Sequence, residues 1–240
     1  MLVDVGLSGR EIRRRLKTIG VHGENLDAIV VSHEHSDHTR GLRVLSNEFN
    51  LPVYINYDTL SSVHGKEIKG KIREFESGNP FAIGGLSFQP FSVPHDAVDP
   101  VGYTIKYRDL KIGIATDLGF ATKLVIERLK DCDLLILESN HDEEMLKSGP
   151  YPWVLKQRVM SRQGHLSNNQ AGTLIKEVYH EGLKHIILFH LSETNNRPEK
   201  AGEGVNFLFK NNKYHPIHVL LAMQDRVGEM ISISPENKWI

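Results

Sequence analysis

The chain has 240 residues, of which 40% are hydrophobic and 25% charged. This ordinary globular composition excludes disordered, collagen-like and coiled-coil chains. The length suits one α/β domain over residues 1–240. The formal net charge of −1 excludes a globally basic nucleic-acid binder, but it leaves room for a local basic patch. The single cysteine cannot form an internal disulfide, and no secretory leader is recognisable at the start of the sequence. Every apolar run is far shorter than the ~20 residues of a membrane span. We therefore expect a cytoplasmic protein without membrane contact.

The first half of the chain alternates strand and helix patterns. Residues 2–5 predict a strand, and the helix after them carries Ile12, Leu16 and Ile19 on one face. Continuous β-branched runs predict buried strands at residues 28–31 and 52–56. Short strands separated by glycine or proline turns follow, at 71–75, 81–83, 86–91 and 101–105.

In the second half, apolar runs predict strands at residues 111–116, 134–137 and 185–189, and helices are expected at 122–129 and 199–209. Ser167 and Gln170 have the spacing of a capping box, in which each side chain bonds the other residue's backbone amide, and this predicts a helix start before 171–179. The chain is expected to close with a hairpin of 218–224 and 229–234.

A dense group of potential metal ligands follows the strand at 28–31. In the pattern His33-x-His35-x-Asp37-His38, four potential metal ligands occupy six positions, and the loops at strand ends are where functional groups collect. Imidazole and carboxylate suit Zn²⁺, Mn²⁺ or Fe²⁺. The alternation lets two histidines face one metal while the aspartate and the last histidine reach a neighbour, so this run predicts two metal ions.

Three later residues have the same setting, a polar ligand directly after an apolar strand. His95 follows residues 91–94, Asp117 follows the strand at 111–116, and His190 follows the strand at 185–189. Each could alone be a capped loop residue. Together, and in this order after the histidine run, they predict the completion of a binuclear metal site.

This ordered set resembles the pattern of the metallo-β-lactamase superfamily over nearly the whole chain. The resemblance implies a four-layer αββα fold, with two mixed sheets flanked by helices, and a role for Asp4 in orienting metal ligands. Family members usually begin with an additional strand pair ahead of Asp4, which we expect to be lacking here. In phosphodiesterase members, the residues matching His33, His35 and His95 bind the first metal, those matching Asp37, His38 and His190 bind the second, and the residue matching Asp117 bridges.

Three further segments resemble the YycJ/WalJ-like nuclease subfamily: 149–153, 164–168 and 190–196. This resemblance implies a 5′ to 3′ exonuclease of double-stranded DNA with two divalent ions, Zn²⁺ or Mn²⁺. We expect DNA as the nucleic-acid partner ahead of RNA. The alternatives left open are an RNase Z-like ribonuclease, a small-molecule thioester or lactone hydrolase, and a non-catalytic metal-binding regulatory protein.

Two residues are predicted to act in catalysis. Asp37 would orient the attacking water or accept its proton. His165 resembles the histidine that assists leaving-group departure in transfer-RNA 3′-processing relatives, which makes it the candidate proton donor; the alternative is a loop histidine bonded to an aspartate or to the backbone. Glu138 could orient His165 or be a solvated acid, and it stays outside the predicted set.

A local basic arm leads to His165, because residues 145–175 contain no acid. Cations beside aromatic side chains suit a phosphate backbone and stacked bases, although a solvated loop with Trp153 packed on the core is an alternative. Asn195 and Asn196 could hold a terminal phosphate or form a turn. The predicted substrate-binding residues are Trp153, Lys156, Arg158, Arg162, Asn195 and Asn196.

Overall fold

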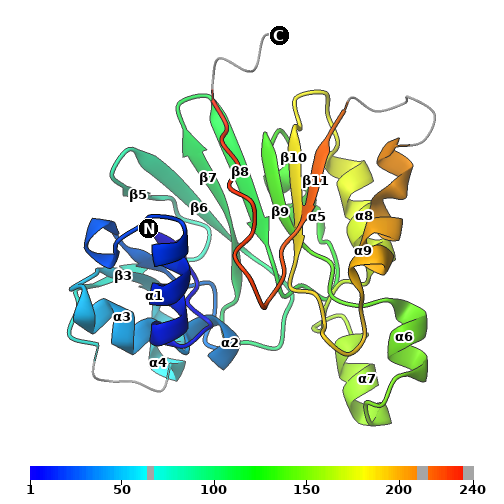
Figure 1. The fold of residues 1–240 in the computed structure, drawn as a ribbon, viewed down its shortest axis with the longest axis horizontal. Coiled ribbons are helices and arrows are strands. Elements are labelled where there is room, and N and C mark those ends of the chain that lie inside the picture. Colours follow the sequence, from blue (N-terminus) through cyan, green and yellow to red (C-terminus); the bar gives the residue numbers. More distant parts are fainter. Residues whose placement is uncertain (64–67, 210–215, 235–240) are drawn as a thin grey trace. The chain divides into compact units, whose positions relative to one another are not determined.

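The computed structural model describes residues 1–63, 68–209 and 216–234, and its ribbon is drawn in Figure 1. The chain divides into two compact units. Unit 1 comprises residues 1–92 and 97–101, and unit 2 comprises residues 93–96 and 102–240. Each unit contains strands and helices, which confirms the predicted α/β class. No described helix is long and apolar enough to cross a membrane.

Unit 1 contains a four-stranded sheet in the order β1-β2-β3-β4, and its described pairings are all parallel. The prediction of a mixed sheet is therefore wrong here. The physical reason is that a helix connects each strand to the next, and such a crossover returns the chain in the same direction. A hairpin of β5 and β6 follows. The strands are β1 (Leu2–Val3), β2 (Ile29–Val30), β3 (Val53–Asn56), β4 (Ile72–Phe75), β5 (Phe81–Ile83) and β6 (Leu86–Ser92).

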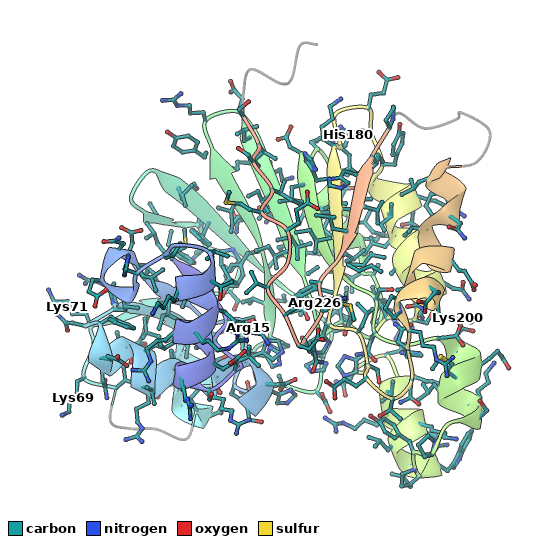
Figure 2. The ribbon with its side chains drawn as sticks, in the orientation of Figure 1. Arg15, Lys69, Lys71, His180, Lys200 and Arg226 are labelled. Atoms are coloured by element: carbon teal, nitrogen blue, oxygen red, sulfur yellow. The ribbon has the colours of Figure 1, made fainter. Side chains whose placement is uncertain are left out.

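Helices of unit 1 pack their apolar faces against the four-stranded sheet. Ile12 and Leu16, one turn apart on α1, share a buried cluster with residues of α3, β2 and β3. The side chain of Ser8 caps α1. Arg15, labelled in Figure 2, donates from Nε to Glu11 at 2.8 Å. The helical segments are α1 (Gly9–Thr18), η1 (Gly23–Asn25), α2 (Ser36–Thr39), α3 (Leu42–Glu48) and α4 (Tyr57–Ser62).

In unit 2 the strands follow the order β11-β10-β9-β8-β7. β7 and β8 pair antiparallel, whereas β8, β9, β10 and β11 pair parallel, so this sheet is mixed as predicted. Its buried strands lie where the apolar runs were expected. The strands are β7 (Val101–Tyr107), β8 (Leu110–Ala115), β9 (Leu134–Glu138), β10 (His185–Phe189) and β11 (His218–Leu221).

The predicted closing hairpin is wrong. β11 pairs with β10 in parallel, and residues 229–234 form no strand. The connection from β10 to β11 passes through α9 (Pro198–Val205) and η2 (Asn206–Phe209), and a helical crossover of this kind gives a parallel neighbour.

The helices of unit 2 include two that the sequence did not predict, α6 (Glu143–Ser148) and α7 (Trp153–Val159). Figure 1 shows both at the end of the sheet where β9 and β10 end. The predicted capping box at the start of α8 (Asn168–Val178) is confirmed, because Ser167 and Gln170 each accept a hydrogen bond from the other's backbone amide. The predicted helix before β9 is α5 (Lys123–Leu129).

Candidate metal centre

In unit 1 the histidine run leaves the carboxyl end of β2 and enters α2. The side chains of His33 and His38 are buried, with 1% and 5% of their residue surface exposed, whereas Asp37 is exposed. The imidazole centres of His33 and His35 are 4.7 Å apart, and those of His33 and His38 are 4.0 Å apart. The structure therefore gathers three imidazoles of unit 1 in one place, beside a carboxylate that water can reach.

Asp4 organises these imidazoles. Its carboxylate accepts hydrogen bonds from the Ser32 backbone amide at 2.8 Å, the Ser32 hydroxyl at 2.7 Å and His38 Nδ1 at 2.8 Å. The Ser32 hydroxyl in turn accepts from His33 Nδ1 at 2.9 Å. With Nδ1 as the donor in both rings, Nε2 of His33 and of His38 carries the lone pair, which is the tautomer that binds a metal. Sequence reasoning missed the role of Ser32, because a serine after a strand gives no distinctive signal.

A close backbone approach holds Asp4 against α2. The amide of Val5 donates to the His38 carbonyl at 2.7 Å, and a Cβ on Gly6 would lie 1.4 Å from the Asp37 carbonyl oxygen. Asp4 itself has a positive φ of 56°. A non-glycine residue in this region costs free energy, and such strain collects at functional sites.

A cavity of about 430 Å³ in unit 1 begins at this run. His35 and Glu34 lie on its wall, and the exposed residues Arg40 and Arg43 also line it. Two guanidinium groups beside an imidazole suit an anionic ligand. The remaining lining residues are Ser36, Thr39, Leu42, Ser62, Val63 and Ile68.

In unit 2 the predicted ligands meet around Asp117, which is 2% exposed. Its Oδ1 atom lies 3.6 Å from Nε2 of His95 and 3.6 Å from Nε2 of His190. Asp117 follows β8 and His190 follows β10, and both have a positive φ, 54° and 57°. The side chains of Asp117 and His190 therefore lie close together, and each is held by a strained backbone conformation. Asp4 in unit 1 has the same kind of strained backbone.

Glu138 is the functional residue that sequence reasoning undervalued. It ends β9 and is fully buried, and its Oε1 atom accepts hydrogen bonds from Nδ1 of His165 at 2.7 Å and of His190 at 2.8 Å. Its Oε2 atom accepts from the backbone amides of Leu118 and Leu166. The available signal was an acid at the end of a buried strand, which the sequence alone could not separate from a solvated residue.

The pKa values in unit 2 follow from burial and charge. Burial alone would raise the pKa of the Glu138 carboxyl, but the charge and hydrogen bond of His165, together with the hydrogen bond from His190, outweigh it and bring the pKa to about 2. Burial alone would lower the pKa of His165, but the negative charge of Glu138 and its hydrogen bond raise it. Burial lowers the pKa of His95.

These residues fit a divalent metal ion. His95 donates from Nδ1 to the Gly164 carbonyl at 3.1 Å and His190 donates from Nδ1 to Glu138, so both Nε2 atoms carry lone pairs. Each of those nitrogens lies 3.6 Å from Asp117 Oδ1, and such a pairing of imidazole lone pairs with a carboxylate suits a bound cation. Nitrogen and carboxylate donors are those of zinc and manganese sites.

The predicted substrate-binding residues lie in different environments. Trp153 is 62% exposed, so it does not pack on the core. Lys156 is 9% exposed, and its Nζ donates to the Lys147 carbonyl at 2.6 Å, which commits it to holding α7 in place. Arg158 pairs with Asp96, and Arg162 stacks on Phe120 with 3.9 Å from Cζ to the ring centre.

Asn195 and Asn196 are both buried, at 1% and 5% exposure. The amide of Asn196 donates to the carbonyls of Ser139 and Asn140, and its Oδ1 accepts from Asn168 Nδ2. These bonds tie the loop after β10 to the loop after β9. The sequence left two roles open for Asn195 and Asn196, a terminal phosphate site or a turn, and these contacts favour the turn.

A family model described as a beta-lactamase superfamily domain matches residues 1–191. The chain therefore belongs to the metallo-β-lactamase superfamily, and it is a metal-dependent hydrolase, as predicted. The solved structure of the metallo-β-lactamase fold protein YhfI from Bacillus subtilis is 22% identical, covers 92% of this chain and 84% of its own, and has a TM-score of 0.68, which shows the shared fold.

Two curated relatives are more similar in sequence. The exodeoxyribonuclease YycJ of Bacillus anthracis is 36% identical over 211 residues, which is 86% of this chain and 79% of the relative. The exodeoxyribonuclease WalJ of Streptococcus pneumoniae serotype 2 is 37% identical over 206 residues, 84% of this chain and 77% of the relative. The predicted resemblance to the YycJ/WalJ-like subfamily is confirmed.

Proposed function

We propose that this chain is a binuclear metal-dependent exonuclease that hydrolyses double-stranded DNA in the 5′ to 3′ direction. The observation that carries the proposal is the similarity to two proteins named exodeoxyribonucleases over 84–86% of the chain. The convergence of His95, Asp117 and His190 in unit 2 supports the metal dependence.

The ligands in this proposal are those that the family resemblance implies. When bound, two divalent ions, Zn²⁺ or Mn²⁺, would supply Lewis-acid stabilisation of a phosphodiester and an activated water. Asp4 and Glu138 hold the imidazoles of His38 and His190 in the metal-binding tautomer. The residues that would hold the first ion are His33, His35 and His95, those that would hold the second are Asp37, His38 and His190, and Asp117 would contact both.

His165 is the proposed proton donor to the leaving oxygen. Its Nδ1 donates to Glu138, which directs Nε2 away from that carboxylate, and the same contact raises the pKa of the imidazole. The exposed carboxylate of Asp37 orients the attacking water or accepts its proton. Glu138 acts through His165 and is a positioning residue.

The decisive experiment is digestion of linear double-stranded DNA that carries a label at the 5′ or the 3′ end. We expect release of the 5′ label as mononucleotide before loss of the 3′ label, abolition by a chelator, and recovery with Zn²⁺ or Mn²⁺. Asp37→Ala and His165→Ala are expected to remove the activity while both variants remain folded. The matched control is His218→Ala, an exposed histidine on β11.

Three results would overturn parts of this proposal. Internal cleavage of circular DNA would contradict the exonuclease mode. Preference for single-stranded or transfer RNA over DNA would favour a ribonuclease. Metal binding with no cleavage of nucleic acid, but with turnover of a thioester or lactone, would favour a small-molecule hydrolase.

Arg40 and Arg43 are expected to contact the phosphate backbone from the cavity that starts at His35. The double substitution Arg40→Gln and Arg43→Gln should weaken DNA binding about tenfold and reduce the slope of log affinity against log salt concentration by about 2, because each phosphate contact contributes roughly one unit. Fluorescence anisotropy with chelated protein measures both. Lys123→Gln with Arg128→Gln on α5 changes the net charge equally and should leave the slope unchanged; equal losses in the two pairs would contradict this assignment.

A further inference from the structure

The guanidinium group of Arg162 lies over the ring of Phe120, with 3.9 Å from Cζ to the ring centre. Arg162 is exposed and Phe120 is partly buried. A guanidinium is planar, and its five N–H groups point outward in that plane. A ring against one face therefore fixes the orientation of the plane and leaves its edges available to an anion.

Arg162 differs from the other three cations of the basic arm at residues 145–175, because those three are used within the protein. Lys147 forms an ion pair with an acid of its own helix. Lys156 donates to the Lys147 carbonyl, and Arg158 donates to Asp96. Over the described part of the chain, Arg162 has no carboxylate within ion-pair distance. Its charge is the one in this arm that remains for an external anion.

Two loops of unit 2 fix the backbone around this stacked pair. A Cβ on Gly119 would lie 2.4 Å from the Arg162 carbonyl oxygen, so the loop after β8 approaches the loop after α7 at the level of the backbone. The amide of Gly164 donates to the Ser161 carbonyl at 3.0 Å, which closes a turn around Arg162. Phe120 directly follows Gly119, so the ring and the base of the arginine side chain are held next to each other.

The pair lies close to the residues of the proposed reaction. Arg162 precedes His165 by three residues, and Phe120 follows Asp117 by three residues. Three residues of extended chain span at most about 11 Å, and successive phosphates of one DNA strand rise about 3.4 Å along the helix axis. The guanidinium is therefore in reach of a phosphate within a few nucleotides of the bond that would be cleaved.

We propose that Arg162 binds a backbone phosphate that flanks the cleaved bond, and that Phe120 is the platform that holds its guanidinium for this contact. The inference deepens the proposed function and rests on it. A flanking phosphate is bound equally in the ground state and the transition state, so its loss raises KM and leaves kcat unchanged. Phe120 acts through Arg162 and is a positioning residue.

The test combines steady-state kinetics on linear double-stranded DNA with fluorescence anisotropy of the chelated protein. Arg162→Gln is expected to raise KM about tenfold with kcat unchanged, and to reduce the slope of log affinity against log salt concentration by about 1. Arg162→Lys should retain the slope but recover only part of the affinity, because an ammonium group has no plane to stack and no fork of donors. Phe120→Leu should weaken binding about threefold at an unchanged slope, because the charge stays.

Arg108→Gln is the matched control. The Arg108 guanidinium also lies over an aromatic ring, that of Tyr107 at 5.2 Å, but in the turn between β7 and β8, at the opposite end of β8 from Asp117. This variant should keep the wild-type KM and slope.

The outcomes separate this inference from the proposed function. If the wild-type chain neither binds nor cleaves DNA, the proposed function fails. If it does both, and Arg162→Gln has the wild-type KM and slope, only the role of Arg162 is overturned. A lower kcat at unchanged KM would contradict a flanking phosphate, and wild-type affinity in Phe120→Leu would contradict the platform.

Discussion

Replacement of Asp117 by asparagine is expected to lower the rate of DNA hydrolysis about a thousandfold, because a carboxylate in the proposed bridging position would contribute several kcal/mol of metal-dependent transition-state stabilisation. The substitution keeps the size and shape of the side chain and removes its charge. In the proposed centre this charge faces the metal-binding nitrogens of His95 and His190, each 3.6 Å away. Metal content, measured by elemental analysis after gel filtration, should fall together with the rate.

Asparagine is the informative substitution for a second reason. Asp117 has a φ of 54°, and asparagine tolerates this left-handed conformation better than other non-glycine residues. Asp117→Ala should therefore lower the free energy of unfolding by roughly 1 kcal/mol more than Asp117→Asn. A comparison of the two variants separates the effect of charge from that of backbone strain. Full activity and full metal content in Asp117→Asn would show that this carboxylate does not bridge metals.

Strand ends explain how much of the site the sequence could predict. β8 and β10 are apolar runs with β-branched residues, so Asp117 and His190 could be placed just beyond them. In unit 2 the parallel strands β8, β9 and β10 are neighbours in the sheet, and their carboxyl ends meet at one edge. The sequence order of polar residues after such strands therefore carries information about which side chains lie close together.

The order of apolar strands and polar residues does not predict which side chains of distant segments form hydrogen bonds with each other. Nothing near Lys156 in sequence indicates that its ammonium group donates to the Lys147 carbonyl, and the sequence pattern therefore predicts a basic surface instead. The buried hydrogen bonds of Asn196 could not be predicted from the sequence either, because asparagine is common both in turns and in ligand sites. Hydrophobic periodicity predicts that β11 is a strand, but it does not predict which strand pairs with it, and for this reason the predicted hairpin is wrong.

Glu138→Gln is expected to be the most destabilising single substitution of a polar residue in unit 2 outside the metal ligands. The carboxylate accepts from two imidazoles through Oε1 and from two backbone amides through Oε2, which uses all of its acceptor positions. An amide nitrogen placed on either side would face two donors. Each buried donor that loses its acceptor costs about 1 to 3 kcal/mol, so the loss in the free energy of unfolding should be roughly 2 to 5 kcal/mol.

The same substitution should weaken metal binding, because His190 loses the acceptor that fixes its tautomer, and we expect an affinity about 10- to 100-fold lower. Chemical denaturation of the chelated protein measures stability, and zinc competition measures affinity. Glu143→Gln is the control, since Glu143 is a partly buried carboxylate with a hydrogen bond from the Ser167 hydroxyl at 2.9 Å. It should cost about 1 kcal/mol of stability and leave the metal affinity unchanged. Equal effects of the two substitutions would mean that Glu138 stabilises the fold without positioning His190, whereas loss of metal affinity in Glu138→Gln alone would place this strand-end carboxylate in the metal centre.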